Sequence, residues 1–190
     1  MLRGKFLQLR TVRKRDLDDL YAKLNDLEYR GSFFPLGIQA EPVFRRKFDE
    51  DGFWSKDEGM LLMIDPNDEV VGEIEFYPII HYLSGYELSY LVFGSDHRGK
   101  GYTTEAVKLL TRYLFEKHIN RVQLAIHPEN KASLRVAQKA GYTMEGQIED
   151  AGSTKAGSRI SRSGRSSGTS SPLHEQRRRR LMPVVSPDFL

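Results

Sequence analysis

The spacing of apolar residues divides the first half of the chain into strands and helices. Apolar and polar residues alternate from Phe6 to Val12, which predicts a half-buried strand. The spacing then becomes helical, with an apolar face that begins at Leu17 beside acidic residues that suit a helix N-terminus. A second amphipathic helix is expected over 41–53. Three strand patterns bounded by turn signals follow, at 60–64, 70–77 and 86–93.

The second half of the pattern alternates helices with strands. A broad apolar face predicts a helix over 103–117, and further strand and helix patterns follow at 121–126, 130–140 and 142–148. Gly141 stands where the C-terminal cap of the second helix belongs. The whole order indicates a mixed α/β domain, α+β in layout, in which a meander of strands leads into a strand–loop–helix–strand unit.

The composition changes sharply after residue 150. Residues 151–180 contain eight serines, four glycines and seven arginines, but only two large aliphatic residues, Ile160 and Leu173. Such a segment cannot bury enough apolar surface to offset the entropy lost on ordering it. We therefore expect a folded domain at 1–150 and a disordered, low-complexity tail at 151–190.

Charge and residue types exclude several classes of function. Residues 151–190 hold eight Lys and Arg against two Asp and Glu, so the positive net charge of the chain, +3, comes from the tail. The remaining residues, 1–150, are acidic overall and give no sign of nucleic-acid binding. The chain has no cysteine, and its five histidines show no ligand spacing, so no metal site is expected. No apolar run reaches the roughly 18 residues of a membrane span, and the N-terminus lacks the apolar core of a signal peptide. A cytoplasmic protein without a membrane partner is expected.

The clearest chemistry lies in the loop between the strand that ends near Phe93 and the next predicted helix. The loop contains three glycines and the cations Arg98 and Lys100. The first amides of a helix have no intrahelical partner, and together with the helix dipole they attract anions, which glycines allow to approach closely. The loop matches neither GxxxxGK[ST] nor GxGxxG, so a P-loop and a nicotinamide site are not indicated. Taken alone, the pattern leaves open a phosphate site and an ordinary turn with solvated cations.

Two segments together resemble the markers of one enzyme family. Residues 98–103 (RGKGYT) resemble the R/QxxGxG/A pyrophosphate motif of the GNAT superfamily of N-acetyltransferases, and residues 130–142 (NKASLRVAQKAGY) resemble its second marker, NxxSxxVxxKxGF. The separation and element order agree over about residues 5–150, most closely with the branch that acetylates N-terminal amines of ribosomal proteins. The resemblance implies a GNAT-like fold, a mostly antiparallel sheet with splayed strands flanked by helices. It also implies transfer of an acetyl group from acetyl-CoA to a primary amine.

The resemblance further implies which residues bind acetyl-CoA. Arg98 would assist in holding the pyrophosphate on the backbone amides of Gly99, Lys100, Gly101, Tyr102 and Thr103. The pantetheine arm would lie along a bulged strand that splays from its neighbour, at the backbone of Leu91, Val92 and Phe93. Asn130 and Ser133 would lie near the pantetheine and the sulfur, and Asn130 is equally suited to cap the helix that follows it. Thr103 adds bulk where the motif has Gly or Ala.

The implied reaction needs a base and an acid. A protonated amine must lose a proton before it attacks, and Glu87 stands on the strand entering the loop, a common base position in the family. Glu73 and Glu75 on the preceding strand are rivals, and each carboxylate can equally be an outward-facing charge. A backbone amide would stabilise the oxyanion, and Ser133 would protonate the departing thiolate. Ala137 stands where some branches place a tyrosine acid.

The tail departs most from the family, whose last strand continues into another that completes a hairpin beside the acceptor site. No such strand is predicted after Glu149, and the tail's composition indicates translation in a shifted frame, a hypothesis that the coding DNA tests. Two alternatives follow. The first is a protein that binds CoA without turnover because the strand is missing. The second is nucleic-acid binding by 177–180, which is disfavoured because the tail has no aromatic residue before Phe189 to stack on bases.

The partner of the reaction stays open between a peptide N-terminus and a small-molecule amine, and so does a homodimer. Four aromatic residues are candidates either for the core or for the lining of an acceptor cleft: Phe33, Phe34, Trp54 and Tyr82. The fold alone does not choose among acceptors, because function lies in the site.

Overall fold

The computed structural model describes residues 1–34, 37–79, 85–149 and 181–187, with 147–149 and 181–187 described by their backbone. The strands are β1 (Leu2–Arg3), β2 (Gln8–Thr11), β3 (Gly59–Ile64), β4 (Val70–Pro78), β5 (Tyr86–Val92), β6 (Val122–Ala125), β7 (Tyr142–Glu149) and β8 (Leu181–Pro187). The helices are α1 (Leu17–Asn25), α2 (Leu27–Arg30), α3 (Glu41–Asp51), α4 (Tyr102–Glu116) and α5 (Lys131–Lys139). A short 3-10 helix, η1 (Lys14–Asp16), leads into α1.

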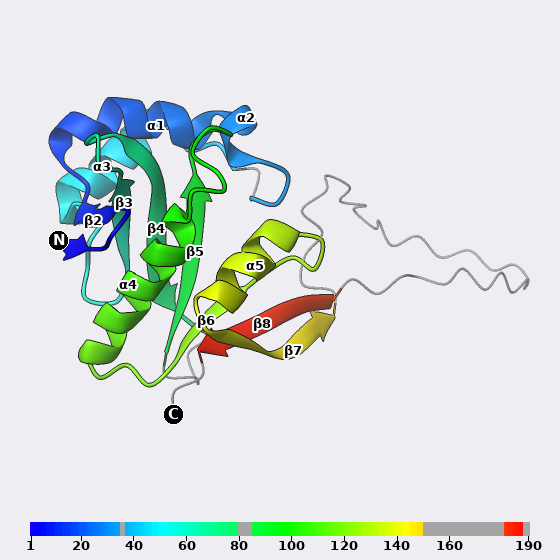
Figure 1. Cartoon of the computed structure of the whole chain (residues 1–190). Helices are drawn as coiled ribbons and strands as arrows, with labels where there is room; N and C mark the ends of the chain where they lie inside the picture. Colours follow the sequence, from blue (N-terminus) through cyan, green and yellow to red (C-terminus); the bar gives the residue numbers. More distant parts are fainter. Residues whose placement is uncertain (35–36, 80–84, 150–180, 188–190) are drawn as a thin grey trace, which may run out of the picture.

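The strands form one mixed sheet in the order β1-β2-β3-β4-β5-β6-β8-β7 (Figure 1). Every neighbouring pair is antiparallel except β5 and β6, which are parallel. The parallel pair is joined by the loop and helix α4, since parallel strands need a crossover connection. The predicted mixed α/β fold is confirmed, and each predicted strand and helix is present to within a few residues.

Helices cover both faces of the sheet. One buried cluster joins α4 and α5 to the sheet and includes Val107 and Leu88. A second joins α1 and α3 to the opposite face and includes Leu20 and Leu91. Leu88 and Leu91 point to opposite faces because side chains alternate along a strand. Among the described residues, no helix combines the length and apolar content needed to cross a bilayer.

The prediction that the last strand is missing is wrong. Strand β8 lies between β6 and β7 and pairs antiparallel with both, with β7 from Glu149 to Tyr142 and with β6 at Leu124 and Ala125. Prolines at 183 and 187 obscure the strand in the sequence, because proline cannot donate to a ladder. Pairing with two neighbours outweighs that local signal, since β6 and β7 would otherwise each present an open edge. The remaining tail residues, 150–180 and 188–190, lie outside the described residues, and the domain boundary at 150 stays a prediction.

Candidate active site

Strands β5 and β6 begin as neighbours and then separate. They pair only at Tyr86 with Val122 and at Glu87 with Gln123, although β5 continues to Val92. The other edge of β5 stays paired with β4 throughout, in one register from Tyr86 to Val92. The predicted splay is therefore present, whereas the predicted bulge is absent from the pairing of β5 with β4. Beyond Glu87, one edge of β5 has no strand partner in the described part of the chain.

The backbone groups of β5 face its two neighbours alternately. The amide of Phe93 donates to the Val71 carbonyl on β4 at 2.9 Å, and the amide of Tyr86 donates to the Arg121 carbonyl on the β6 side at 2.9 Å. Odd-numbered residues therefore bond to β4, and even-numbered residues face the splay. The expectation for Leu91 and Phe93 is corrected, because their backbone groups face β4; Val92 faces the splay, as do Leu88 and Tyr90. The sequence pattern identified the strand but not this phase.

The loop that follows β5 has the conformation of an anion site. Gly99 and Gly101 have φ angles of 75° and 87°, which favour glycine, and a Cβ added at either would meet no atom within 4 Å. Gly101 is the N-cap of α4 and no side chain caps this helix. In the described part of the chain, no hydrogen bond occupies the backbone amides of Gly99, Lys100, Gly101, Tyr102 and Thr103. Five amides and two exposed cations, Arg98 and Lys100, are thus open to a ligand.

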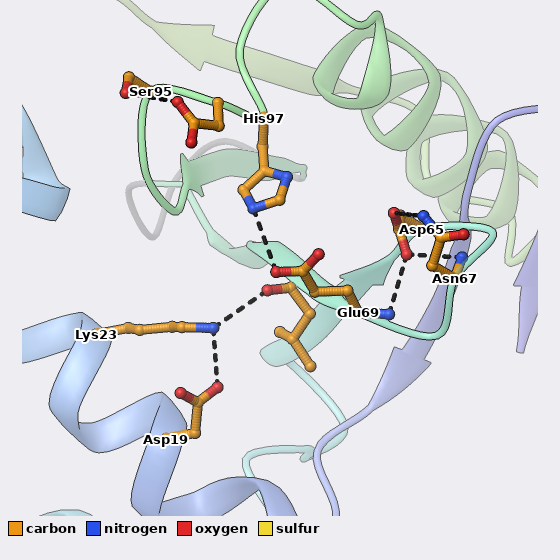
Figure 2. Close-up of polar contacts among 9 residues, drawn as sticks. Asp19, Lys23, Asp65, Asn67, Glu69, Ser95 and His97 are labelled. Atoms are coloured by element: carbon orange, nitrogen blue, oxygen red, sulfur yellow. Dashed lines mark hydrogen bonds and ion pairs between the residues drawn. The ribbon is translucent and has the colours of Figure 1, made fainter.

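Polar contacts hold this loop to the turn between β3 and β4 (Figure 2). His97 Nε2 lies 3.5 Å from Glu69 Oε1, and its ring points toward that carboxylate. The turn itself is fixed by Asp65, whose Oδ1 accepts from the amides of Asn67 at 2.9 Å and Glu69 at 3.0 Å. Lys23 on α1 donates to the Val70 carbonyl at 3.4 Å beside this turn. These contacts connect α1, the turn and the loop, so they position His97, which directly precedes Arg98.

Helix α5 brings a hydroxyl to the open part of β5. Asn130 caps the helix through its side-chain oxygen, which accepts from the Ser133 amide at 3.0 Å. The Ser133 hydroxyl is hydrogen-bonded to the hydroxyl of Tyr90 on β5. Burial raises the pKa of Tyr90 to about 12, and the bond to Ser133 acts in the opposite direction. Tyr90 was not among the predicted site residues, although its place two residues before Val92 on the strand is a signal that could have found it.

Two carboxylates of β4 lie beside β5 on the other face. Glu73 pairs across the strands with Leu91, and Glu75 pairs with Ser89, and directly opposed residues point to the same face. Glu73 is only 1% exposed, and its Oε2 has no hydrogen-bond partner among the described residues. Burial, and then the charge of Glu75, raise the pKa of Glu73 well above its ordinary value. Burial also raises the pKa of Glu75, against the opposing charge of Lys47.

Glu73 and Glu75 line a cavity of about 290 Å³. The rest of its wall combines polar and charged residues with aromatic and apolar ones; the latter are Leu24, Phe34, Phe44, Phe53, Met60, Phe76 and Tyr77. Buried acid beside an apolar wall suits a small organic cation. Of the four aromatic candidates, Phe34 lines this cavity and Trp54 packs edge-on against Phe76 at 5.3 Å. Phe33 lies 5.2 Å from the His127 ring, and Tyr82 lies outside the described residues.

Comparison with known proteins assigns the family. Residues 7–143 match the family model described as an acetyltransferase (GNAT) domain, and this match spans most of the chain. The chain belongs to the GNAT acetyltransferase family. The resemblance indicated by residues 98–103 and 130–142 is confirmed at this level, and the narrower likeness to the ribosomal-protein branch stays a prediction.

Relatives within the GNAT family match parts of the chain. YjcK of Bacillus subtilis, a probable N-acetyltransferase, is 34% identical over 83 residues, which are 42% of this chain and 45% of YjcK. An N-acetyltransferase named p20 from Bacillus licheniformis is 31% identical over 47% of this chain and 50% of that protein. The chain thus spans about half the length of these two relatives. YokL, a prophage-derived N-acetyltransferase of B. subtilis, is 29% identical over 76% of this chain and 80% of its own length.

Solved structures of GNAT proteins share the fold. An acetyltransferase from Bacillus anthracis superposes with a TM-score of 0.67 at 20% identity, over 97% of this chain and 96% of that one. The spermidine N-acetyltransferase from Vibrio cholerae, solved with CoA and spermine, gives 0.68 at 14% identity, over 96% and 95%. At these identities the likeness extends to the fold alone.

Within this GNAT fold, Glu87 occupies a different setting from the one expected of a base. Its Oε1 accepts from the Tyr77 hydroxyl at 3.1 Å, and its Oε2 accepts from Gln123 Nε2 at 2.9 Å. Both oxygens are therefore engaged at the point where β5 and β6 begin to separate, so Glu87 joins three strands. Glu73, by contrast, lines a cavity and has one oxygen without a hydrogen-bond partner among the described residues. Among the described residues, no group of three or more His, Cys, Asp or Glu could hold a metal ion.

Proposed function

We propose that this chain is an acetyl-CoA-dependent N-acetyltransferase that acts on a compact primary amine. The observation that carries the proposal is the buried carboxylate of Glu73, which lines a partly aromatic cavity and pairs across the strands with Leu91 on the splayed strand. A site of this kind attracts an ammonium group and removes a proton from it. The family assignment supports acetyl transfer as the reaction.

The residues present fit the CoA part of the donor. The open amides of the loop and the cations Arg98 and Lys100 match a pyrophosphate, because unpartnered amides at a helix N-terminus favour negative charge. The edge of β5 that has no strand partner in the described part of the chain, with backbone groups of Leu88, Tyr90 and Val92, offers hydrogen-bonding partners to an amide-bearing arm. Acetyl-CoA supplies the activated acetyl group as a thioester.

Glu73 is the base in this proposal, in place of Glu87. A carboxylate whose pKa is raised by burial is a stronger base than a solvated one, so it is better matched to an ammonium. The amine nitrogen gives one proton to Glu73 and then forms a bond to the acetyl carbon while the carbon–sulfur bond breaks. Its second proton is lost as the amide forms, and Glu73 passes its proton to water.

The pair of Ser133 and Tyr90 supplies the proton for the departing sulfur. Ser133 is the residue that the family resemblance placed near the sulfur, and Tyr90 extends it into a two-hydroxyl relay. Since the pKa of Tyr90 is raised to about 12, the phenol stays protonated at neutral pH and can donate. The second proton released by the nitrogen restores the relay.

A compact amine is favoured over an amine on a folded protein surface because the cavity is small. Its volume of about 290 Å³ holds a small amine or the first residue of a peptide but not a folded surface. The spermidine N-acetyltransferase from Vibrio cholerae shows that a protein of the same fold acts on a small amine, and this supports a small-amine acceptor only through the shared fold. The alternative of CoA binding without turnover loses its motive, because β8 occupies the place of the strand thought missing. Nucleic-acid binding by 177–180 concerns residues outside the described part.

The proposal is tested with the purified full chain, acetyl-CoA and a panel of small amines and peptides. We expect a rise in melting temperature with acetyl-CoA, thiol release that depends on an amine, and a product heavier by one acetyl group. Glu73→Gln should abolish most turnover without weakening the acetyl-CoA shift, and Glu87→Gln should retain more activity. A folded chain that shows neither a thermal shift nor thiol release would defeat the assignment.

A further inference from the structure

The cavity lined by Glu73 has positively as well as negatively charged side chains in its wall. Its charged residues are the carboxylates Glu58, Glu73 and Glu75 and the cations Arg30 and Lys47. Burial favours the neutral form of Glu73, but an ammonium bound beside it favours the ionised form, and with all five groups ionised they sum to one negative charge. The cavity is therefore matched to an acceptor that brings one positive charge, and a second charge would have no counterpart.

Lys47 on α3 is the cation that lies against the acidic side of the cavity. Its Nζ is 3.0 Å from Glu58 Oε1, and these two side chains are 46% and 47% exposed, which places them toward solvent. Burial lowers the pKa of Lys47, but the bond to Glu58 and the charges of Glu58, Asp51 and Glu75 outweigh it, so the net shift is upward. Lys47 is thus a permanent ammonium beside the carboxylates.

The depth of the carboxylates differs. Glu73 is 1% exposed and has an oxygen with no partner among the described residues, whereas Glu58 is already paired and Glu75 feels the charge of Lys47. Arg30 is held within the cavity wall, with its Nε donating to the Leu24 carbonyl and its guanidinium 5.5 Å from the Phe34 ring. The deepest carboxylate is the one left to meet an incoming ammonium.

We propose that Lys47 is a specificity-determining residue that selects acceptors with a single ammonium group over diamines and polyamines. This inference rests on the proposed acetyl transfer in the same cavity. An acceptor ammonium pairs with Glu73, and a second ammonium farther along the molecule finds Glu58 already paired with Lys47. Lys47 occupies the position that the second ammonium of a polyamine would take.

The inference makes this chain differ in acceptor from a fold relative named for spermidine. Removing the charge of Lys47 would leave Glu58 unpaired and would create a position for a second cation. Two charges a few ångströms apart in a partly exposed site interact strongly enough for the change in acceptor preference to be measured.

The test compares hexylamine with the diamine of the same chain length as acceptors. The wild-type chain should have the higher kcat/KM for hexylamine, and Lys47→Met should shift the ratio toward the diamine by roughly tenfold. Lys47→Met/Glu58→Gln removes both charges and should return the ratio toward that of the wild type. Lys56→Met removes an exposed lysine outside the lining and should leave the ratio unchanged. Lys47→Arg retains the charge and should keep the wild-type preference.

Calorimetric binding of the two amines in the presence of CoA measures the same preference without turnover. A wild-type preference for the diamine, or an unchanged ratio in Lys47→Met, would overturn the inference. If the amines bind with the expected preference but no acetyl group is transferred, the proposed function fails while the role of Lys47 stands. If acetyl transfer occurs without the preference, the proposed function stands and the role of Lys47 fails.

Discussion

The hydroxyl of Tyr90 on β5 and the hydroxyl of Ser133 on α5 are hydrogen-bonded to each other. The contact joins the splayed strand to the helix that carries the second family marker. In the proposed mechanism it supplies the acid that Ala137 cannot, at the position where the family resemblance places a tyrosine in some branches. A buried tyrosine with a pKa near 12 is a proton donor at neutral pH.

Tyr90→Phe should therefore lower kcat by about a hundredfold, because the thiolate then leaves without its proton donor. The KM for acetyl-CoA should change little, and steady-state kinetics separate the two. Tyr142→Phe is the matched control, since Tyr142 is buried and its hydroxyl bonds Thr111 at 2.5 Å on the same side of the sheet. That variant should lose about 1 kcal/mol of stability and keep its kcat. Equal kcat in Tyr90→Phe and wild type would remove the relay from the mechanism.

Gly101→Ala should weaken acetyl-CoA binding at least about tenfold, because a side chain at φ 87° is strained by roughly 1–2 kcal/mol and would crowd the amides that face the phosphates. Binding is measured by calorimetry well below the melting temperature. Gly37→Ala is the control, since an added Cβ there also meets no atom within 4 Å and its φ lies outside the left-handed region. A Gly101→Ala variant that binds acetyl-CoA as tightly as Gly37→Ala would argue against the phosphate site.

Glu73→Gln should stabilise the chain increasingly as the pH rises. The pKa of Glu73 in the folded chain lies above its ordinary value of 4.5 because of burial and the charge of Glu75. A group with a raised folded pKa contributes stability that is complete below the unfolded pKa and is lost as the pH rises through the folded pKa. Glutamine cannot ionise, so the variant avoids this loss.

Melting temperatures of Glu73→Gln and wild type between pH 5 and pH 8 check this prediction. One kcal/mol corresponds to roughly 2–4 °C for a chain of this size. Glu116→Gln, which changes an exposed carboxylate on α4, should show a difference that does not grow with pH. The same constant difference in Glu73→Gln would mean that Glu73 titrates like a solvated carboxylate.

Truncation after Arg180 should destabilise the domain, because it removes β8 from between β6 and β7 and opens two edges. We expect a lower melting temperature and faster amide exchange at Leu124 and Ala125, which pair with β8. Deletion of part of 151–175 with β8 retained is the control and should preserve both values. Unchanged exchange after truncation would show that β8 contributes little to the sheet.

The sequence determined most elements of this protein through local signals. Alternation from Phe6 to Val12, the helical face that begins at Leu17 and the apolar face of 103–117 each record how one segment buries its own side chains. The glycines of the loop and the cap at Asn130 are equally local, because each concerns the conformation of a few residues. These patterns, with the two family markers, were sufficient for the fold class and the family.

Tertiary structure alone decided the phase of β5, the different surroundings of Glu73 and Glu87, and the last strand. Whether the backbone groups of Leu91 or those of Tyr90 face the splay depends on which edge of β5 pairs with β4. The alternation of apolar and polar residues in the sequence is the same in both cases. Glu73 and Glu87 look alike in sequence; burial in a cavity separates the first from the second, whose oxygens are engaged by Tyr77 and Gln123. Strand β8 lies more than thirty residues from its partner β7, and its stability comes from two neighbours rather than from its own proline-containing pattern. Each of these outcomes depends on contacts between distant segments, which a local pattern cannot encode.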